Sequence, residues 1–282
     1  MSGEAEKAER AYVYMVRCAG GQLYTGWTND PASRLHAHKS GKGAKCTRAL
    51  GAQRFAYLER CIDKSAALRR EAALKKLTKA QKETMCAEWA EKNLPRLSLA
   101  TRADAAEILD IYNWYVLHHT ATFQVTPSSL PEYEDWVDST RALIPLLLAR
   151  DGEGKLLGYA CAHRYHPREA YDWAVESTIY CAPDARGFGV GDTLYRALLD
   201  ILDGMGYWNV YALVADPNPA SERIHARLGF TCVGREPHTA YKFGWLGLST
   251  WWLPLRRGNE KPEPTHPLTQ EQVEEILGRY QA

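Results

Sequence analysis

A glycine-rich turn stands between a strand-like run and a helical run in the second half of the chain. The turn reads Ala182-Pro-Asp-Ala-Arg-Gly-Phe-Gly-Val-Gly191; a strand is expected over 172–181 and a helix over 192–203. At such a junction free backbone N–H groups and the positive end of the helix dipole converge on an anion. The sequence therefore predicts a phosphate-binding site here.

The glycines of this turn do not have the G-x-G-x-x-G spacing of a dinucleotide site, and no Lys-Ser or Lys-Thr follows as in a P-loop. Arg186-x-x-Gly189-x-Gly191 instead resembles the pyrophosphate loop of the GNAT N-acetyltransferases. Ile224-His-Ala-Arg-Leu-Gly-Phe230, after an expected strand at 209–215, resembles the motif that ends that fold. The resemblance implies acetyl-CoA as cofactor, held by Arg186, Gly187, Phe188, Gly189, Val190, Gly191, Thr178, Ile179, Tyr180 and Asn218.

Acetyl transfer to an amine needs a base, because an ammonium of pKa about 8 to 10 is mostly protonated at pH 7 and only the neutral amine attacks. Tyr171-Asp-Trp-Ala-Val-Glu-Ser-Thr178, Thr122-Phe123 and Tyr241-Lys-Phe-Gly244 resemble the phosphinothricin and methionine-sulfone acetyltransferase branch, over about 96–255. That resemblance implies Glu176 as general base and Phe123, Tyr171 and Lys242 as substrate-binding residues. For Glu176, an ion pair between strands is the alternative.

His225 occupies the position where most GNAT enzymes have a tyrosine proposed to protonate the leaving thiolate, and this branch often has histidine there. Packing on a helix face is the alternative role. After Gly244 the branch's herbicide-detoxifying members carry His-Asp, whereas this chain continues Trp-Leu-Gly-Leu-Ser-Thr-Trp-Trp252. We therefore expect a hydrophobic or sulfur-containing amino acid, or a related small amine, as acceptor. The resemblance also implies a homodimer through this domain.

The N-terminal part differs from the rest in charge. Residues 11–82 hold 15 Lys and Arg against 4 Asp and Glu, a balance of +11 in a chain of net charge +1, so the remainder carries −10. A basic domain attracts phosphate backbones with salt-dependent affinity. A solvated basic surface is the alternative.

Tyr12-Val-Tyr14, Tyr24-Thr-Gly26, Arg34, His38 and Glu71 resemble the signature of the GIY-YIG endonuclease superfamily, in its small single-domain bacterial branch. The first tripeptide departs from the family name at its glycine and isoleucine. The resemblance implies that Glu71 binds a divalent metal, Mg or Mn, that Tyr14 and Tyr24 help to activate water, and that Arg34 stabilises the phosphate, with His38 available as a base. Phosphodiester hydrolysis needs such groups.

Lys42, Lys45 and Arg48 would then contact the phosphate backbone of a nucleic acid without base specificity. Two alternatives stay open for this domain. It could bind nucleic acid without cleaving it, or it could deliver a protein or nucleic-acid substrate to the acetyltransferase.

The expected elements set a geometric condition on the nuclease hypothesis. Residues 12–18 and 23–27 predict a hairpin, and a two-residue Gly20-Gly21 turn would place Tyr14 and Tyr24 on opposite faces of it, whereas a three-residue turn or a bulge places them together. Helices are expected over 31–39, 65–77 and 78–92, with a strand at 54–59. Glu71 should lie on an inward stripe with Ala67, Leu68 and Leu74, and its alternative partner is Lys75 at i+4.

The predicted fold class is α/β (α+β), with a small three-stranded antiparallel sheet and helices, followed by a GNAT mixed sheet flanked by helices. The predicted domains are 11–92, 96–257, and a proline-broken linker with a short helix at 258–282. In that helix Thr269 and Gln272 form a capping box, and Val273, Ile276 and Leu277 share one side, so the helix should dock on a domain or partner.

The cysteines and the N-terminal segment bear on the cellular compartment of the protein. Seven scattered cysteines without a C-x-x-C pair predict reduced thiols rather than a zinc site. The charged start lacks the apolar region of a signal peptide, and no apolar run approaches the ~20 residues of a membrane span. We expect a cytoplasmic protein with no membrane partner.

Overall fold

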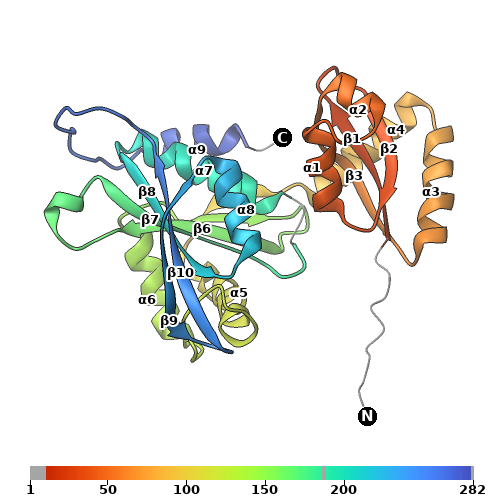
Figure 1. The fold of residues 1–282 in the computed structure, drawn as a ribbon. Helices are drawn as coiled ribbons and strands as arrows, with labels where there is room; N and C mark the ends of the chain where they lie inside the picture. Colours follow the sequence, from red (N-terminus) through yellow and green to blue (C-terminus); the bar gives the residue numbers. More distant parts are fainter. Residues whose placement is uncertain (1–10, 186–188, 281–282) are drawn as a thin grey trace, which may run out of the picture. The chain divides into compact units, whose positions relative to one another are not determined.

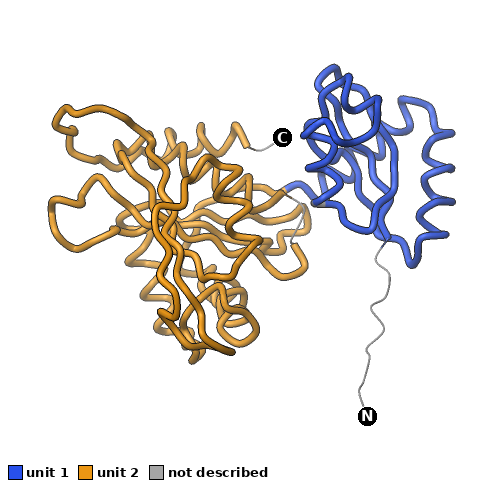
Figure 2. The backbone as a smooth tube through the Cα atoms, in the orientation of Figure 1, with its two compact units in different colours: residues 1–94 blue, residues 95–282 orange. Residues whose placement is uncertain are grey.

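The structure is a computed structural model that describes residues 11–185 and 189–280. The chain divides into two compact units, residues 1–94 and 95–282 (Figure 2). Within the described residues, no helix combines the length and the apolar character that crossing a bilayer requires.

The first unit is built on an antiparallel sheet with strand order β2-β1-β3, against which helices pack (Figure 1). Its elements are β1 (Ala11–Cys18), β2 (Leu23–Thr28), α1 (Pro31–Lys39), α2 (Lys45–Leu50), β3 (Ala52–Cys61), α3 (Lys64–Lys76) and α4 (Lys79–Asn93). The predicted three-stranded sheet is confirmed. Helix α2 was not predicted, because it has only six residues and its N-cap residue, Ala44, has no side chain that could cap it.

Aspartates begin two of these helices. The side chain of Asp30 accepts from Ser33 N at 3.0 Å at the start of α1, and that of Asp63 accepts from Ala66 N at 2.7 Å at the start of α3. These bonds satisfy backbone donors that the first turn leaves unpaired.

The inward stripe of α3 was predicted only in part. Ala67 and Leu74 are fully buried, as expected, but Leu68 is 43% exposed, so its assignment to the stripe was wrong. Successive helical residues are about 100° apart, which places Leu68 at the edge of the line through Ala67, Glu71 and Leu74.

The second unit contains a mixed sheet with strand order β4-β5-β6-β7-β8-β10-β9, in which only β7 and β8 pair in parallel. Its elements are β4 (Arg96–Leu99), η1 (Arg102–Asp104), α5 (Ala105–His118), α6 (Leu130–Arg141), β5 (Leu147–Arg150), β6 (Leu156–Arg164), η2 (Glu169–Tyr171), β7 (Ala174–Cys181), α7 (Val190–Gly204), β8 (Asn209–Asp216), α8 (Pro219–Leu228), β9 (Thr231–Tyr241), β10 (Trp245–Pro254) and α9 (Gln270–Gly278). The predicted mixed sheet flanked by helices is confirmed.

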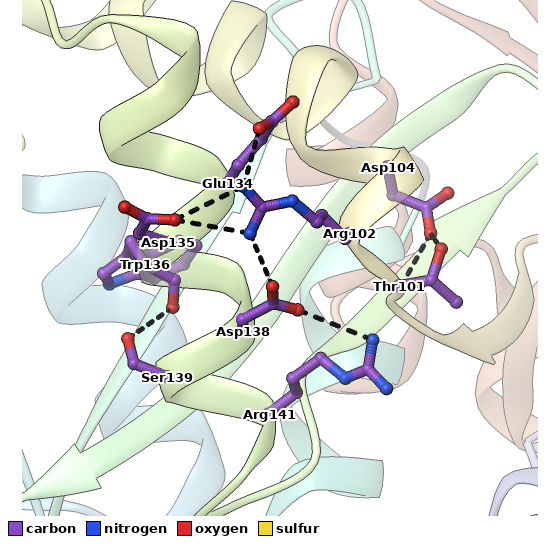
Figure 3. A network of polar contacts seen from close by, with 9 residues as sticks. All are labelled: Thr101, Arg102, Asp104, Glu134, Asp135, Trp136, Asp138, Ser139 and Arg141. Atoms are coloured by element: carbon purple, nitrogen blue, oxygen red, sulfur yellow. Dashed lines mark hydrogen bonds and ion pairs between the residues drawn. The ribbon is translucent and has the colours of Figure 1, made fainter.

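Helices α5 and α6 cover one face of this sheet, and α7 and α9 cover the other (Figure 1). Helix α6 was not predicted, although Ser129 and Glu132 form the capping box that marks its start, with Ser129 N donating to Glu132 Oε2 at 2.8 Å. Arg102 of η1 holds α6 in place: it contacts Glu134, Asp135 and Asp138 at 2.8, 3.3 and 2.6 Å (Figure 3).

The C-terminal segment packs on the second unit. Trp173 Nε1 donates to Glu263 O at 2.7 Å, and His266 N donates to Met205 O at 3.0 Å, so the stretch expected to be a linker is fastened to the sheet and to the end of α7. The predicted capping box at Thr269 is present. The apolar side of α9 joins the core, where its buried residues are Val273, Ile276 and Leu277.

Two candidate active sites

The turn between β1 and β2 decides the geometry of the first site. Cys18 N donates to Gln22 O, and Gly21 N donates to Cys18 O, both at 2.9 Å, which leaves three residues in the loop. Val16 pairs with Tyr24, and Tyr14 pairs with Gly26. Tyr14 and Tyr24 therefore share one face of the sheet, with ring centroids 6.3 Å apart, in the register that catalysis requires.

The hydroxyl of Tyr14 lies between a base and a cation. Arg34 Nε donates to it at 2.9 Å, and His38 Nε2 is 2.8 Å away. His38 Nδ1 is 2.6 Å from Thr47 Oγ1, whose own proton goes to Ala44 O at 2.9 Å. Nδ1 must therefore donate, which assigns the neutral tautomer in which Nε2 accepts the Tyr14 proton.

Burial controls the protonation of this pair. Tyr14 is fully buried, and burial raises its pKa while the bond and charge of Arg34 act against that rise. Burial, and then the charge of Arg34, lowers the pKa of His38. A Cβ on Gly26 would lie 2.5 Å from the Tyr14 hydroxyl oxygen, so the glycine of the second tripeptide makes room for the catalytic candidate.

Glu71 faces this cluster from α3 and also forms the alternative ion pair. Its side chain is 14% exposed and lies 2.7 Å from Lys75 Nζ, and its negative charge contributes to the raised pKa of Tyr14. No group of three or more His, Cys, Asp or Glu gathers for a metal among the described residues. Mg²⁺ often keeps several waters and takes one or two carboxylates. A single carboxylate is compatible with that chemistry, and the binding of a divalent ion by Glu71 stays a prediction.

Sequence reasoning missed Thr47, which α2 brings to His38 and which is fully buried. A lone threonine in a short, uncapped helix gave no signal. The cations predicted to contact phosphates are exposed on α2 and the loop before it: Lys42, Lys45 and Arg48.

In the second unit, β7 and β8 separate partway along their length. Their parallel pairing runs from Ala174 and Asn209 to Glu176 and Tyr211, and then stops. Strand β8 goes on to pair with β10, while β7 stays paired with β6 alone. The residues predicted to bind the pantetheine arm lie on β7 beyond the separation: Thr178, Ile179 and Tyr180.

Helix α7 begins near the end of β7. Gly189 is its N-cap residue and has φ 85°. The backbone N–H groups of the first turn, which includes Val190, therefore donate no hydrogen bond to a capping side chain. A Cβ on Gly191 would approach Ile224 Cδ1 to 3.3 Å and Cys181 Sγ to 3.4 Å, so this side of α7 is tightly packed against its neighbours. These features fit the diphosphate of acetyl-CoA. Arg186, Gly187 and Phe188 lie outside the described residues.

Asn218 caps α8, because its Oδ1 accepts from Ser221 N at 3.2 Å. Glu176 lies at the point of separation, with its side chain 21% exposed. It faces His163 of β6, whose Nε2 is 3.5 Å from Glu176 Oε2. The cross-strand contact weighed as the alternative is therefore present, and its partner is a histidine that the sequence did not single out.

His225 is buried, and both ring nitrogens have partners. Nδ1 donates to Ser221 O at 2.8 Å, and Nε2 is 3.0 Å from the hydroxyl of Tyr195, which in turn is 2.6 Å from Ser177 Oγ. Tyr195 is also buried. His225 is thus part of a polar chain under the sheet, an arrangement that favours the packing role.

The predicted substrate residues lie in two places. Tyr171 lines a hollow of about 250 Å³ together with Trp173, Tyr211 and Pro262. Lys242 is buried, and its Nζ donates to Thr122 O at 2.9 Å and to Tyr115 O at 3.3 Å, which joins the β9–β10 turn to the segment that carries Phe123.

A sheet that opens beside an uncapped helix start, with a carboxylate at the opening, is an arrangement that can hold the diphosphate of coenzyme A and deprotonate an amine. Residues 108–230 match the family model of the acetyltransferase (GNAT) family, and residues 10–84 match that of the GIY-YIG catalytic domain. The chain belongs to the GNAT acetyltransferase family, and its first unit is a GIY-YIG domain.

Curated relatives resemble the second unit. Phosphinothricin N-acetyltransferase of Streptomyces viridochromogenes is 36% identical over 170 residues, which cover 60% of this chain and 90% of the relative. L-methionine sulfoximine/L-methionine sulfone acetyltransferase of Pseudomonas aeruginosa is 37% identical over 155 residues, 54% of this chain and 90% of the relative. The crystal structure of a GNAT superfamily phosphinothricin acetyltransferase from Sinorhizobium meliloti in complex with AcCoA superposes with a TM-score of 0.58 at 33% identity, covering 60% of this chain and 93% of that one.

The burial of His225 predicts a pH-dependent stability. Burial lowers the pKa of folded His225, so the unfolded chain takes up the proton more readily, and stability falls as pH drops below about 6.5. For a single titrating group, the free energy of unfolding changes by at most about 1.4 kcal/mol per pH unit. Thermal unfolding of wild type and His225→Gln from pH 8 to pH 5 should show the shallower decline for the variant. Parallel declines would contradict a neutral, buried His225.

Proposed function

We propose that the second unit transfers the acetyl group of acetyl-CoA to the amino group of a small, amino-acid-like substrate. The position of Glu176 at the separation of β7 and β8 carries this proposal. Its carboxylate takes the proton from the substrate ammonium, so that the neutral amine can attack. The start of α7 and Asn218 hold the coenzyme, and the main chain of 178–180 orients its pantetheine arm. Acetyl-CoA supplies the thioester.

Three features support an apolar or sulfur-containing acceptor. The hollow beside Tyr171 is lined by aromatic rings, and Tyr211 within it stacks on Tyr165 with centroids 4.1 Å apart. Strand β10 begins with Trp245, which is 62% exposed, where the herbicide-detoxifying branch carries a polar pair. The L-methionine sulfoximine/L-methionine sulfone acetyltransferase named above has sulfur-containing amino acids as its named substrates.

Replacement of Glu176 by glutamine keeps the shape of the side chain and removes the base. We expect kcat for acetyl transfer to fall by at least about 100-fold, because general bases contribute rate factors of that order. Thiol release from acetyl-CoA measures the rate. The matched control is Glu153→Gln, in the exposed turn between β5 and β6. Unaltered turnover in Glu176→Gln would remove this residue from the mechanism.

An amine panel tests the acceptor class. Methionine, methionine sulfone, leucine, phenylalanine, tryptophan and phosphinothricin are compared by kcat/KM in the thiol-release assay. The aromatic hollow predicts higher kcat/KM for the apolar and sulfur-containing amino acids than for phosphinothricin. Activity on phosphinothricin alone would contradict the assignment, and activity only on proteins or nucleic acids would favour delivery of a macromolecule by the first unit.

We propose that the first unit is a metal-dependent endonuclease. The observation that carries this proposal is the Tyr14 hydroxyl, held between the neutral nitrogen of His38 and the guanidinium of Arg34. In this proposal His38 is available as a base, and Arg34 stabilises the phosphate under attack. Tyr24 shares this face, and Glu71 would hold a Mg²⁺ or Mn²⁺ ion, which supplies charge against the phosphate. Lys42, Lys45 and Arg48 would hold the backbone of the nucleic acid.

Plasmid nicking with Mg²⁺ or Mn²⁺ tests cleavage. We expect Glu71→Gln to reduce the nicking rate by about 100-fold or more, because a metal ion contributes several kcal/mol of transition-state stabilisation. Glu88→Gln, an exposed position on α4, is the matched control and should keep the wild-type rate. Equal cleavage by wild type and Glu71→Gln would remove Glu71 from the mechanism. Binding without cleavage by the wild type would favour the non-cleaving alternative.

A further inference from the structure

A half-exposed histidine lies directly across the sheet from the proposed base. His163 of β6 pairs with Glu176 of β7 in antiparallel register, so both side chains project from the same face. The Nε2 and Oε2 atoms are 3.5 Å apart, and the side chains are 52% and 21% exposed. The histidine therefore links the more enclosed carboxylate to solvent.

Each turnover leaves a proton on the base. When an ammonium is acetylated, one of its protons passes to the carboxylate and another ends on the coenzyme thiol, so one proton per cycle must reach solvent. Glu176 must lose its proton before the next ammonium can be deprotonated. The route by which it does so sets how quickly the site is restored.

The other titratable groups around Glu176 are poor acceptors. They are Cys161 on β6, Tyr211 on β8 and Tyr195 on α7, and burial raises the pKa of each, so they hold their own protons at neutral pH. Histidine is the side chain that ordinarily exchanges protons near neutrality.

We propose that His163 is a positioning and proton-relay residue, which orients Glu176 and carries its proton to solvent. The inference rests on the proposed role of Glu176 as base. The O–H bond on Glu176 breaks, and an N–H bond forms on Nε2 of neutral His163, which regenerates the carboxylate. The imidazolium then releases a proton to water. No electron transfer or co-reactant is involved.

His163→Gln tests the relay through a chemical rescue that a purely structural role would not show. We expect kcat to fall about tenfold at neutral pH, with KM for acetyl-CoA unchanged, and to recover as imidazole is added. Wild type should be insensitive to imidazole. His118→Gln, exposed at the end of α5, is the matched control and should behave like wild type. His163→Asn is a second variant in case glutamine disturbs folding, which thermal unfolding reports.

The outcomes separate the relay from the base. If Glu176→Gln is inactive and His163→Gln is slow but rescued, both assignments hold. If Glu176→Gln is inactive while His163→Gln keeps the wild-type rate, or is slow without rescue, the relay is overturned and the base stands. Full activity of Glu176→Gln would overturn the proposed function and the relay with it.

Discussion

The separation of β7 from β8 is the constraint on which the second unit depends. A strand that loses its partner leaves peptide groups uncovered, and such groups must find other donors and acceptors. At this point Ser177 Oγ donates to Tyr211 O at 3.0 Å, so a side chain bridges the two strands where their ladder ends. Beyond it, the described residues of β7 pair with β6 on one edge, and Glu176, the proposed base, lies where β7 and β8 separate.

The same residues connect the opening to helices α7 and α8. From Ser177 the polar chain passes through Tyr195 and His225 to the first turn of α8. Helix α8 is fixed at its two ends by Asn218 and by Gly229, which has φ 97°. No buried side-chain polar atom among the described residues lacks a hydrogen-bond partner. The series of hydrogen bonds from Ser177 to His225 therefore adds buried polar groups whose hydrogen bonds are satisfied. Hydrogen bonds from the helices that pack on the sheet therefore stabilise the separation of β7 and β8.

The sequence predicted features that repeat a pattern and missed features that depend on a single contact. Periodicity and caps located most of the helices and strands, and motifs located Glu176 and the first-unit cluster. Thr47 and His163 belong to no motif. Thr47 reaches His38 through a helix that was not predicted, and His163 reaches Glu176 through the register of two strands. Lys242 was expected to meet substrate, and the structure instead shows its ammonium on two backbone carbonyls, a contact between segments about 120 residues apart along the chain.

A tyrosine hydroxyl against a neutral histidine occurs in both units, yet the two pairs differ in what surrounds the oxygen. At Tyr14 the third neighbour is Arg34, whose positive charge favours the phenolate but also lowers the pKa of His38. At Tyr195 the third neighbour is the neutral hydroxyl of Ser177, which offers a hydrogen bond and no charge. Transfer of the Tyr195 proton to His225 would leave two buried ions without a third charge beside them, at a large desolvation cost. The first hydroxyl therefore has a cation beside it and the second has none, so the two pairs differ in the neighbour of the pair and not in the pair itself.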